Sequence, residues 1–430
     1  MKFSSTKIKN LEINYATGAT DNSFVGLKYI GNKVYISSPE CYRIIDDDSV
    51  IRQDILDLLG TISIAKTASI EKSKAYNTQN KGGEFALFSY LWVINDFLAN
   101  GFYVNREKVY KTNQNGKINW KRTMQTEPII SKRSIIFPDI VVEKKSEADS
   151  ILIEVHKLCV KKSIDNIGWL FNLSSDFIQT PRFTESLKKV YLNAIKRELD
   201  HTFLDNKRLL LNHMKNVIEG LDENANNRDF VYGVDSYYYI FERMIDSIFG
   251  NVDNIKDFYP AGQWVLLKNE KPIPSSNLRP DTIILKDENG ERIAFILDSK
   301  FYRFGFTGND DDLPETTSIQ KQITYGEYVK RFSESEKAKI KVDKVYSAFI
   351  IPFDKEREQF KSNNNMEYVG YAKSDWKDND NSHEIVHTFL IDLKHVIKTW
   401  NNYNHKEDVD SLVKGILHWQ EEYEKNQPKS

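Results

Sequence analysis

The sequence predicts a mixed α/β (α+β) fold, with a C-terminal domain whose mixed sheet is flanked by helices and an N-terminal region that is β-rich and helical. Apolar runs bounded by turn residues alternate with helical periodicity after residue 226, which is typical of such a sheet. With 40% hydrophobic and 28% charged residues in 430, the chain can form packed cores in two or three domains. An Asn289-Gly290 pair between two apolar runs is a strong hairpin signal.

The chain divides into three predicted regions, 1–60, 61–225 and 226–430. In the first, apolar runs on either side of Gly31-Asn32 predict a hairpin, and a short helix begins near Asp46. The second is predicted to be largely helical and to bind DNA or a partner. Its helices are expected over 84–98 and most of 150–221, with strands and turns over 101–149. The third has predicted helices near 234–249 and 317–333, and strands near 345–352 and 368–373.

The composition excludes several classes of protein. Lys and Arg number 60 against 62 Asp and Glu, so any surface for nucleic acid must come from local segregation of charge. Two cysteines, Cys41 and Cys159, are too few for a four-cysteine metal site and are typical of a reduced, cytoplasmic protein. The N-terminus lacks the apolar run of a signal peptide, and no stretch approaches the roughly 20 apolar residues of a membrane span. We therefore expect a cytoplasmic protein with no membrane partner.

Local segregation of charge does occur in residues 101–145, which hold ten Lys and Arg against four acids. Tyr103, Tyr110 and Trp120 are interleaved with them. Such a segment can contact a phosphate backbone or an acidic protein, or it can be an ordinary solvated surface.

The residues that carry chemistry flank the Asn289-Gly290 turn. Two antiparallel strands joined by this turn bring Asp281 and Asp298 together at one end of the hairpin. The second strand is apolar at every position from Ile293 to Leu297, as expected of a strand covered on both faces. Asp298 and Lys300 lie two residues apart and therefore share a face.

Two carboxylates at close range repel each other unless a cation lies between them. Carboxylate and carbonyl oxygens suit Mg²⁺, with Mn²⁺ as a possible substitute. Such an ion would lower the pKa of a bound water and stabilise charge on a phosphate. Lys300 would position or deprotonate the attacking water, or neutralise the transition state. This is the chemistry of phosphodiester hydrolysis, although a surface hairpin with the same residues by chance is the alternative.

Two predicted helices add candidate residues. Glu242 lies among buried-type neighbours and is either a third metal ligand or a member of a salt bridge. Gln322 and Tyr325 share a helix face, where they would contact the phosphate, order Lys300 or belong to a solvated surface. A second Pro-Asp, Pro138-Asp139, has its nearest following acid, Glu143, only four residues on, which leaves no room for a hairpin. Pairing Asp139 with Glu154 instead leaves no lysine two places after the acid, so Asp139 is interpreted as structural.

The Pro280-Asp281 and Asp298-Ser299-Lys300 arrangement resembles the PD-(D/E)xK nucleases. Within them the chain is similar to the LlaJI-type restriction endonucleases, which are similar to the McrC subunit of modification-dependent restriction systems. Residues 116–123, the Phe241-Glu242 helix and the segment from Ser318 to Tyr325 carry this resemblance.

The resemblance implies a restriction-modification or phage-defence enzyme that cuts double-stranded DNA. Asp281, Asp298 and the Ser299 carbonyl would bind Mg²⁺, Glu242 would complete the site and Lys300 would assist water attack. Such nucleases often work with a McrB-like AAA+ GTPase, which would dock upstream of residue 226. In the RecB-type pattern, QxxxY, a glutamine lies four residues before a tyrosine. In this chain Gln322 lies three residues before Tyr325.

Three functions are consistent with these residues. The leading one is an Mg²⁺-dependent endonuclease, and the others are a catalytically inactive subunit that binds DNA or a partner and a hydrolase of another phosphoester. The intact Asp281, Asp298 and Lys300 favour an active enzyme. Cutting both strands requires two cuts, which leads us to expect a homodimer or transient pairing.

Overall fold

The computed structural model describes residues 11–16, 23–30, 33–47, 50–67, 83–103, 105–131, 134–148, 150–221, 230–252, 255–268, 271–336, 338, 340–378 and 381–426. The chain folds into two compact units. The first is formed mainly by Thr78–Tyr232, and the second mainly by Val34–Asn77 and Gly233–Ser430. In the described part of the chain, no helix is long and apolar enough to cross a membrane. The division into three regions made from the sequence stays a prediction.

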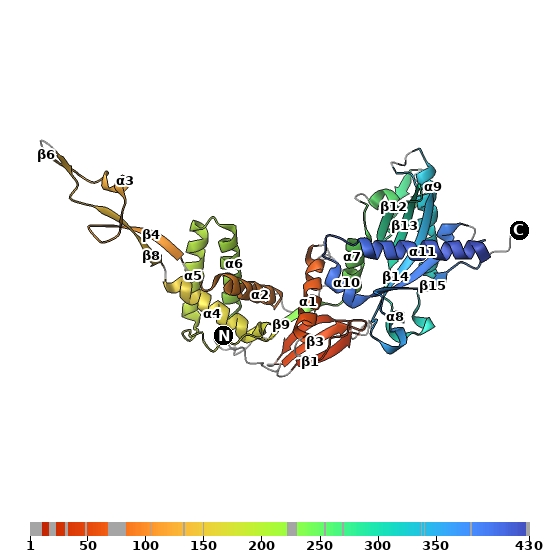
Figure 1. The fold of residues 1–430 in the computed structure, drawn as a ribbon, viewed down its shortest axis with the longest axis horizontal. Coiled ribbons are helices and arrows are strands. Elements are labelled where there is room, and N and C mark those ends of the chain that lie inside the picture. Colours follow the sequence, from red (N-terminus) through yellow and green to blue (C-terminus); the bar gives the residue numbers. More distant parts are fainter. Residues whose placement is uncertain are drawn as a thin grey trace. The chain divides into compact units, whose positions relative to one another are not determined.

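The first unit combines helices with an extension of short strands. Its helices are α2 (Gly83–Asn100), α3 (Trp120–Thr123), α4 (Ser150–Ile167), α5 (Glu185–His201) and α6 (Asp205–Gly220). Its strands are β4 (Asn105–Thr112), β5 (Lys117–Ile118), β6 (Ile129–Ser131), β7 (Ser134–Ile136) and β8 (Val141–Ala148). The strands form a sheet in the order β4-β8-β5 and a separate pair β6-β7, while α2, α4, α5 and α6 pack together (Figure 1). The predicted helices and the strand character of 101–149 are confirmed.

His156 of α4 ties the end of α2 to the helical core of this unit. Its side chain is fully buried, and Nδ1 accepts a hydrogen bond of 2.7 Å from the backbone N–H of Tyr103. That bond requires an imidazole without a proton on Nδ1, and burial lowers the His156 pKa from 6.5 to about 4.

We predict that the first unit loses stability in acid because of His156. Its pKa is lower in the folded than in the unfolded chain, so the stabilisation is complete above pH 6.5 and is lost as the pH falls toward 4. The loss amounts to up to about 3 kcal/mol for a shift of this size. Thermal unfolding between pH 4 and 7 should show a flatter profile for His156→Leu than for the native chain. The exposed His201 of the same unit is the control, and an unchanged profile in His156→Leu contradicts the prediction.

The second unit begins with strands and a helix from the N-terminal part of the chain. Strands β1 (Leu11–Ala16), β2 (Val25–Ile30), β3 (Lys33–Pro39) and β9 (Phe230–Val234) form a sheet in the order β1-β3-β2-β9. The predicted hairpin of β2 and β3 is confirmed, and its turn at 31–32 lies outside the described residues. Helix α1 (Ile51–Thr67) starts later and runs further than expected. Its fully buried Asp54 pairs with Lys394 at 2.6 Å.

The larger sheet of this unit is mixed, in the order β12-β13-β14-β16-β15. Its strands are β12 (Thr282–Glu288), β13 (Glu291–Ser299), β14 (Lys344–Phe353), β15 (Met366–Ala372) and β16 (Val386–Asp392). β13, β14 and β16 are parallel neighbours, whereas β12 and β15 run antiparallel at the edges. Asn289 and Gly290 both have positive φ, 53° and 84°, as a two-residue hairpin turn requires. The predicted hairpin is confirmed.

Helices cover both faces of this sheet (Figure 1). They are α7 (Tyr238–Phe249), α8 (Phe304–Thr307), α9 (Thr316–Glu334), α10 (Leu393–Thr399) and α11 (Lys406–Asn426). Val386 packs with Ile323 of α9, while the next residue, His387, meets Trp419 of α11 with ring centroids 5.0 Å apart. Because successive strand residues point to opposite faces, α9 and α11 lie on opposite sides. The predicted α+β class is confirmed; the first predicted helix of this region starts at Tyr238 because 230–234 form a strand.

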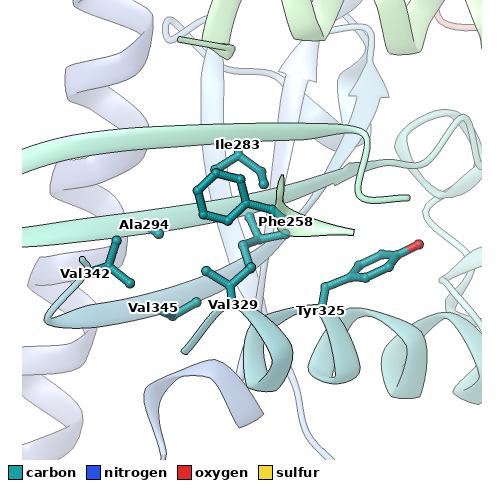
Figure 2. Packing of buried hydrophobic residues seen from close by; sticks show 8 residues of the cluster. Phe258, Ile283, Ala294, Tyr325, Val329, Val342 and Val345 are labelled. Carbon is teal, nitrogen blue, oxygen red and sulfur yellow. The ribbon is translucent and has the colours of Figure 1, made fainter. Parts of the chain in front are cut away.

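The core under α9 positions the end of the β12–β13 hairpin. Figure 2 shows Phe258, Ile283, Ala294, Val329, Val342 and Val345 in one apolar cluster, with the ring of Tyr325 at its margin and its hydroxyl pointing away from the other side chains. Residues Ile293 to Leu297 of β13 are at most 2% exposed, as predicted for a strand covered on both faces. This packing makes the hairpin a rigid support for the residues that follow it.

Candidate active site

The site forms where the β12–β13 ladder ends. Thr282 pairs with Leu297, so Asp281 and Asp298 are the next positions along the two strands. The Asp281 Oδ2 atom accepts a hydrogen bond of 2.9 Å from the backbone N–H of Ser299. The structure therefore brings the two predicted carboxylates to one end of the hairpin.

Lys300 follows β13 and joins the same cluster. Its Nζ lies 2.5 Å from Oδ2 of Asp298, and its backbone N–H donates to the Ile350 carbonyl at 2.9 Å. The Asp298 side chain is only 2% exposed, against 17% for that of Lys300. The Asp298 carboxylate is thus buried, while the Lys300 side chain keeps partial contact with solvent.

Glu242 approaches the carboxylates from α7. Phe301, the residue after Lys300, packs against Phe241 with ring centroids 5.4 Å apart, which holds this turn of α7 beside the end of β13. Burial, followed by the charge of Asp298, raises the pKa of Glu242 to about 7, against the opposing effects of Lys300 and Lys321. Glu242 therefore lies within electrostatic reach of both charged residues at the end of β13.

The pKa of Asp281 is raised by the same burial and the same neighbouring carboxylates. Burial raises its pKa to about 8, with further contributions from the charges of Asp298 and Glu242, and the hydrogen bond from Ser299 acts in the opposite direction. Three acidic groups thus share a region in which like charges are disfavoured, with Lys300 among them.

Gln322 and Tyr325 lie beneath this cluster and are not on a solvated face, since both are 0% exposed. Gln322 Nε2 donates to the Ile296 carbonyl at 2.7 Å, and the Tyr325 hydroxyl donates to the Arg279 carbonyl at 2.9 Å. Gln322 thus contacts the backbone of β13 two residues before Asp298. Tyr325 holds the backbone two residues before Asp281.

A divalent metal ion requires several donor atoms that converge on one point. In the described part of the chain, no group of three or more His, Cys, Asp or Glu side chains is arranged to hold a metal. The set available is two carboxylates and the Ser299 carbonyl, with Glu242 nearby. Apart from its ion pair with the Lys300 ammonium, the buried Asp298 Oδ2 has no hydrogen-bond partner among the described residues. Oxygen donors and buried like charges fit a hard cation, so the residues present are compatible with Mg²⁺ or Mn²⁺.

The second Pro-Asp pair lies in the first unit and takes no part in this cluster. Asp139 is exposed, and its Oδ1 accepts a hydrogen bond of 2.9 Å from Asn113 Nδ2. Asn113 Oδ1 in turn accepts from the Ile140 N–H, so the two side chains close a loop. Asp139 has the structural role that its spacing predicted.

Two contributors to the site were missed from the sequence. Phe301 orients α7, and the Asp298-Ser299-Lys300-Phe301 run already places an aromatic ring beside the lysine. Lys321 acts on Glu242 from α9. Its position next to Gln322 is the only signal in the sequence, because contact between α7 and α9 residues depends on the fold.

The structure is therefore a mixed sheet flanked by helices that carries two carboxylates and a lysine at the end of one hairpin. The LlaJI restriction endonuclease family model matches residues 24–410, and the chain belongs to this family. No curated protein matches the sequence. A solved structure similar to this chain is a half-complex from a tetradecameric assembly of Thermococcus gammatolerans McrB AAA+ hexamers with bound McrC. It is 12% identical, covers 88% of this chain and 81% of that chain, and has a TM-score of 0.36.

Proposed function

We propose that this chain is an Mg²⁺-dependent restriction endonuclease of the PD-(D/E)xK type that hydrolyses phosphodiester bonds in foreign double-stranded DNA. The observation that carries the proposal is the convergence of Asp281, Asp298 and Lys300 at the end of the β12–β13 hairpin. Membership of the LlaJI restriction endonuclease family supports it.

In this proposal Asp281, Asp298 and the Ser299 carbonyl hold the cation, and Glu242 completes the set. A bound Mg²⁺ would supply a more acidic water molecule and an electrophilic contact to the phosphate, with Mn²⁺ as a substitute. The Asp281 carboxylate is fixed by the Ser299 N–H, so its remaining oxygen is directed by the hairpin rather than by a mobile side chain. Burial of Asp298 strengthens its interaction with any cation, since little water competes for it.

Lys300 acts on the water and the phosphate rather than on the cation. Its Nζ is held by Asp298 at 2.5 Å, and its side chain is partly exposed, so the ammonium lies beside the carboxylates with access to solvent. There it orients the attacking water and neutralises charge that develops on the phosphate oxygens. Gln322 supports this arrangement from below by fixing the β13 backbone at Ile296.

We further propose that a McrB-like AAA+ GTPase docks on the first unit. The support is a set of exposed apolar residues on its short strands and the segments between them. Monomeric proteins rarely expose so many neighbouring apolar side chains to solvent. These residues are Ile118, Trp120, Met124, Ile129, Ile130, Ile135 and Ile136. Exposed basic residues of the same strands and turns, such as Lys117 and Lys121, would also allow this surface to bind DNA or an acidic protein.

We also propose that a homodimer, or transient pairing of two chains on DNA, supplies the second cut.

The test is cleavage of supercoiled plasmid DNA by the full chain, with and without a candidate GTPase. We expect nicked or linear products with Mg²⁺ or Mn²⁺ and none with EDTA, because the carboxylates require a cation to act. Calorimetric titration of Mg²⁺ should detect binding to the native chain and weaker binding to Asp281→Asn. If DNA is bound but stays intact with both metals and the partner present, the chain is an inactive binding subunit and the proposal is wrong.

A further inference from the structure

A hairpin of exposed apolar side chains projects from the chain immediately before the site. Strands β10 (Gln263–Val265) and β11 (Pro272–Pro274) pair antiparallel, with Trp264 opposite Ile273. Every described residue from Ala261 to Arg279 is exposed. The large apolar side chains among them are Trp264, Val265, Leu266, Leu267, Ile273 and Leu278.

Such a surface requires an explanation beyond the fold. Trp264 is 65% exposed and Leu267 is 102% exposed, so these side chains contribute little to any core. An isolated two-stranded hairpin is marginally stable in water, and contiguous exposed apolar side chains mark a surface that another molecule covers.

The hairpin is fixed to the candidate active site at both ends. The Leu278 N–H donates to the Pro260 carbonyl at 2.9 Å, and the Ser275 N–H donates to the Gly262 carbonyl at 2.8 Å, which closes its base. On one side Phe258 is buried in the core against Ile283 (Figure 2). On the other side the Arg279 carbonyl is held by Tyr325, two residues before Asp281. The base of the hairpin is therefore held next to the residues that lead into Asp281.

Charge indicates what that molecule is. Residues 261–279 contain Lys268, Lys271 and Arg279 against one acid, Glu270. Two copies of the hairpin paired together would bring like charges into contact, which disfavours a second chain as the occupant. DNA satisfies both properties of the hairpin, since its phosphates attract the cations and its base steps accept inserted apolar side chains.

We propose that residues 261–268 and 271–279 form a DNA-binding arm that inserts Trp264 and Leu267 between base steps beside the bond to be cut, with Lys268 and Lys271 on the flanking phosphates. The inference rests on the proposed function, in that it takes double-stranded DNA as the substrate. By distorting the duplex next to Asp281 and Lys300, the arm would present the phosphate to the site. It would also favour sequences that unstack easily, such as pyrimidine–purine steps.

The test measures binding of the full-length chain to a labelled duplex containing 2-aminopurine, with Asp298→Asn in all proteins so that the DNA stays intact. Adding Trp264→Ser and Leu267→Ser should weaken binding about tenfold, the scale of one lost base–aromatic stack, and remove the rise in 2-aminopurine fluorescence. Lys268→Gln with Lys271→Gln should reduce the slope of log K against log salt by about two, because two phosphate contacts are lost.

Matched controls are Trp376→Ser and Tyr403→Ser, which alter exposed aromatic residues of the same unit, 69% and 107% exposed, outside the arm. They should leave affinity, salt slope and fluorescence unchanged. Trp264→Phe should retain most of the fluorescence change, and thermal unfolding confirms that each variant is folded.

The outcomes separate this inference from the proposed function. Equal affinity and fluorescence for the arm variants and the controls overturn the arm, even if the native chain cuts DNA. Arm-dependent binding by a native chain that cuts no DNA supports the arm and overturns the proposed function. A change in sedimentation of the arm variants without a change in duplex affinity identifies the hairpin as a contact between copies and overturns the proposal.

Discussion

Replacing Asp298 by asparagine should abolish DNA cleavage while leaving the fold intact. Asp298 is the most buried carboxylate of the site and the neighbour of both Asp281 and Lys300. Without its charge the cation loses a ligand and the ammonium loses its anchor. Loss of several kcal/mol of transition-state stabilisation corresponds to a fall of about a thousandfold or more in the rate. Single-turnover cleavage of a plasmid, with quantified nicked and linear products, measures it.

Asp287→Asn is the matched control for this variant. Asp287 belongs to the same hairpin but lies toward its turn, is 67% exposed and pairs with Arg292 at 2.8 Å. Its replacement should change the cleavage rate less than twofold, since an exposed ion pair contributes little to stability and this one lies away from the site. Melting temperatures close to that of the native chain would show that both variants fold. An Asp298→Asn chain that cuts within tenfold of the native rate would refute the assignment.

Local pattern was enough to predict the hairpin and the carboxylates on it. The Asn289-Gly290 turn specifies two residues with positive φ, which fixes the register, and a fixed register decides which side chains meet. Alternation along β13 then determines that Asp298 and Lys300 share a face. These inferences depend only on residues within about twenty positions of each other, where the chain geometry leaves few alternatives.

Contacts between distant segments were not predictable in the same way. Gln322 is polar and lies on a helix, so the sequence leaves a solvated face open, yet packing of α9 on the sheet buries it against Ile296. Likewise, no residue near Asp54 in the sequence predicts that Asp54 pairs with Lys394, 340 residues later. Both residues belong to the unit that carries the site. Such pairings are set by how helices and strands pack, and the order of residues in a single sequence gives no direct signal for them.

Replacing Lys300 by methionine should reduce cleavage about a hundredfold to a thousandfold, which is the range for losing one general acid–base or charge-stabilising group. Methionine keeps the length and apolar stem of lysine, so packing beside Phe301 is conserved while the ammonium is lost. Because Lys300 contacts Asp298 rather than serving as a ligand, Mg²⁺ affinity should be retained or increased as positive charge leaves the site. A large loss of Mg²⁺ affinity in Lys300→Met would contradict this role.

Lys300→Arg separates the ways in which this residue can act. Arginine stays charged at any accessible pH, so it can neutralise phosphate charge but cannot take a proton from water. Substantial residual cleavage in Lys300→Arg, with a cleavage rate independent of pH where the native rate changes, would identify charge as the contribution. Activity as low as that of Lys300→Met would favour proton transfer or strict positioning of the water by Nζ.

Lys286→Met is the control for both Lys300 variants, since Lys286 lies on β12 toward the turn and pairs with Asp410 at 2.6 Å. Its loss should affect stability alone, because its partners belong to β12 and α11 rather than to the site.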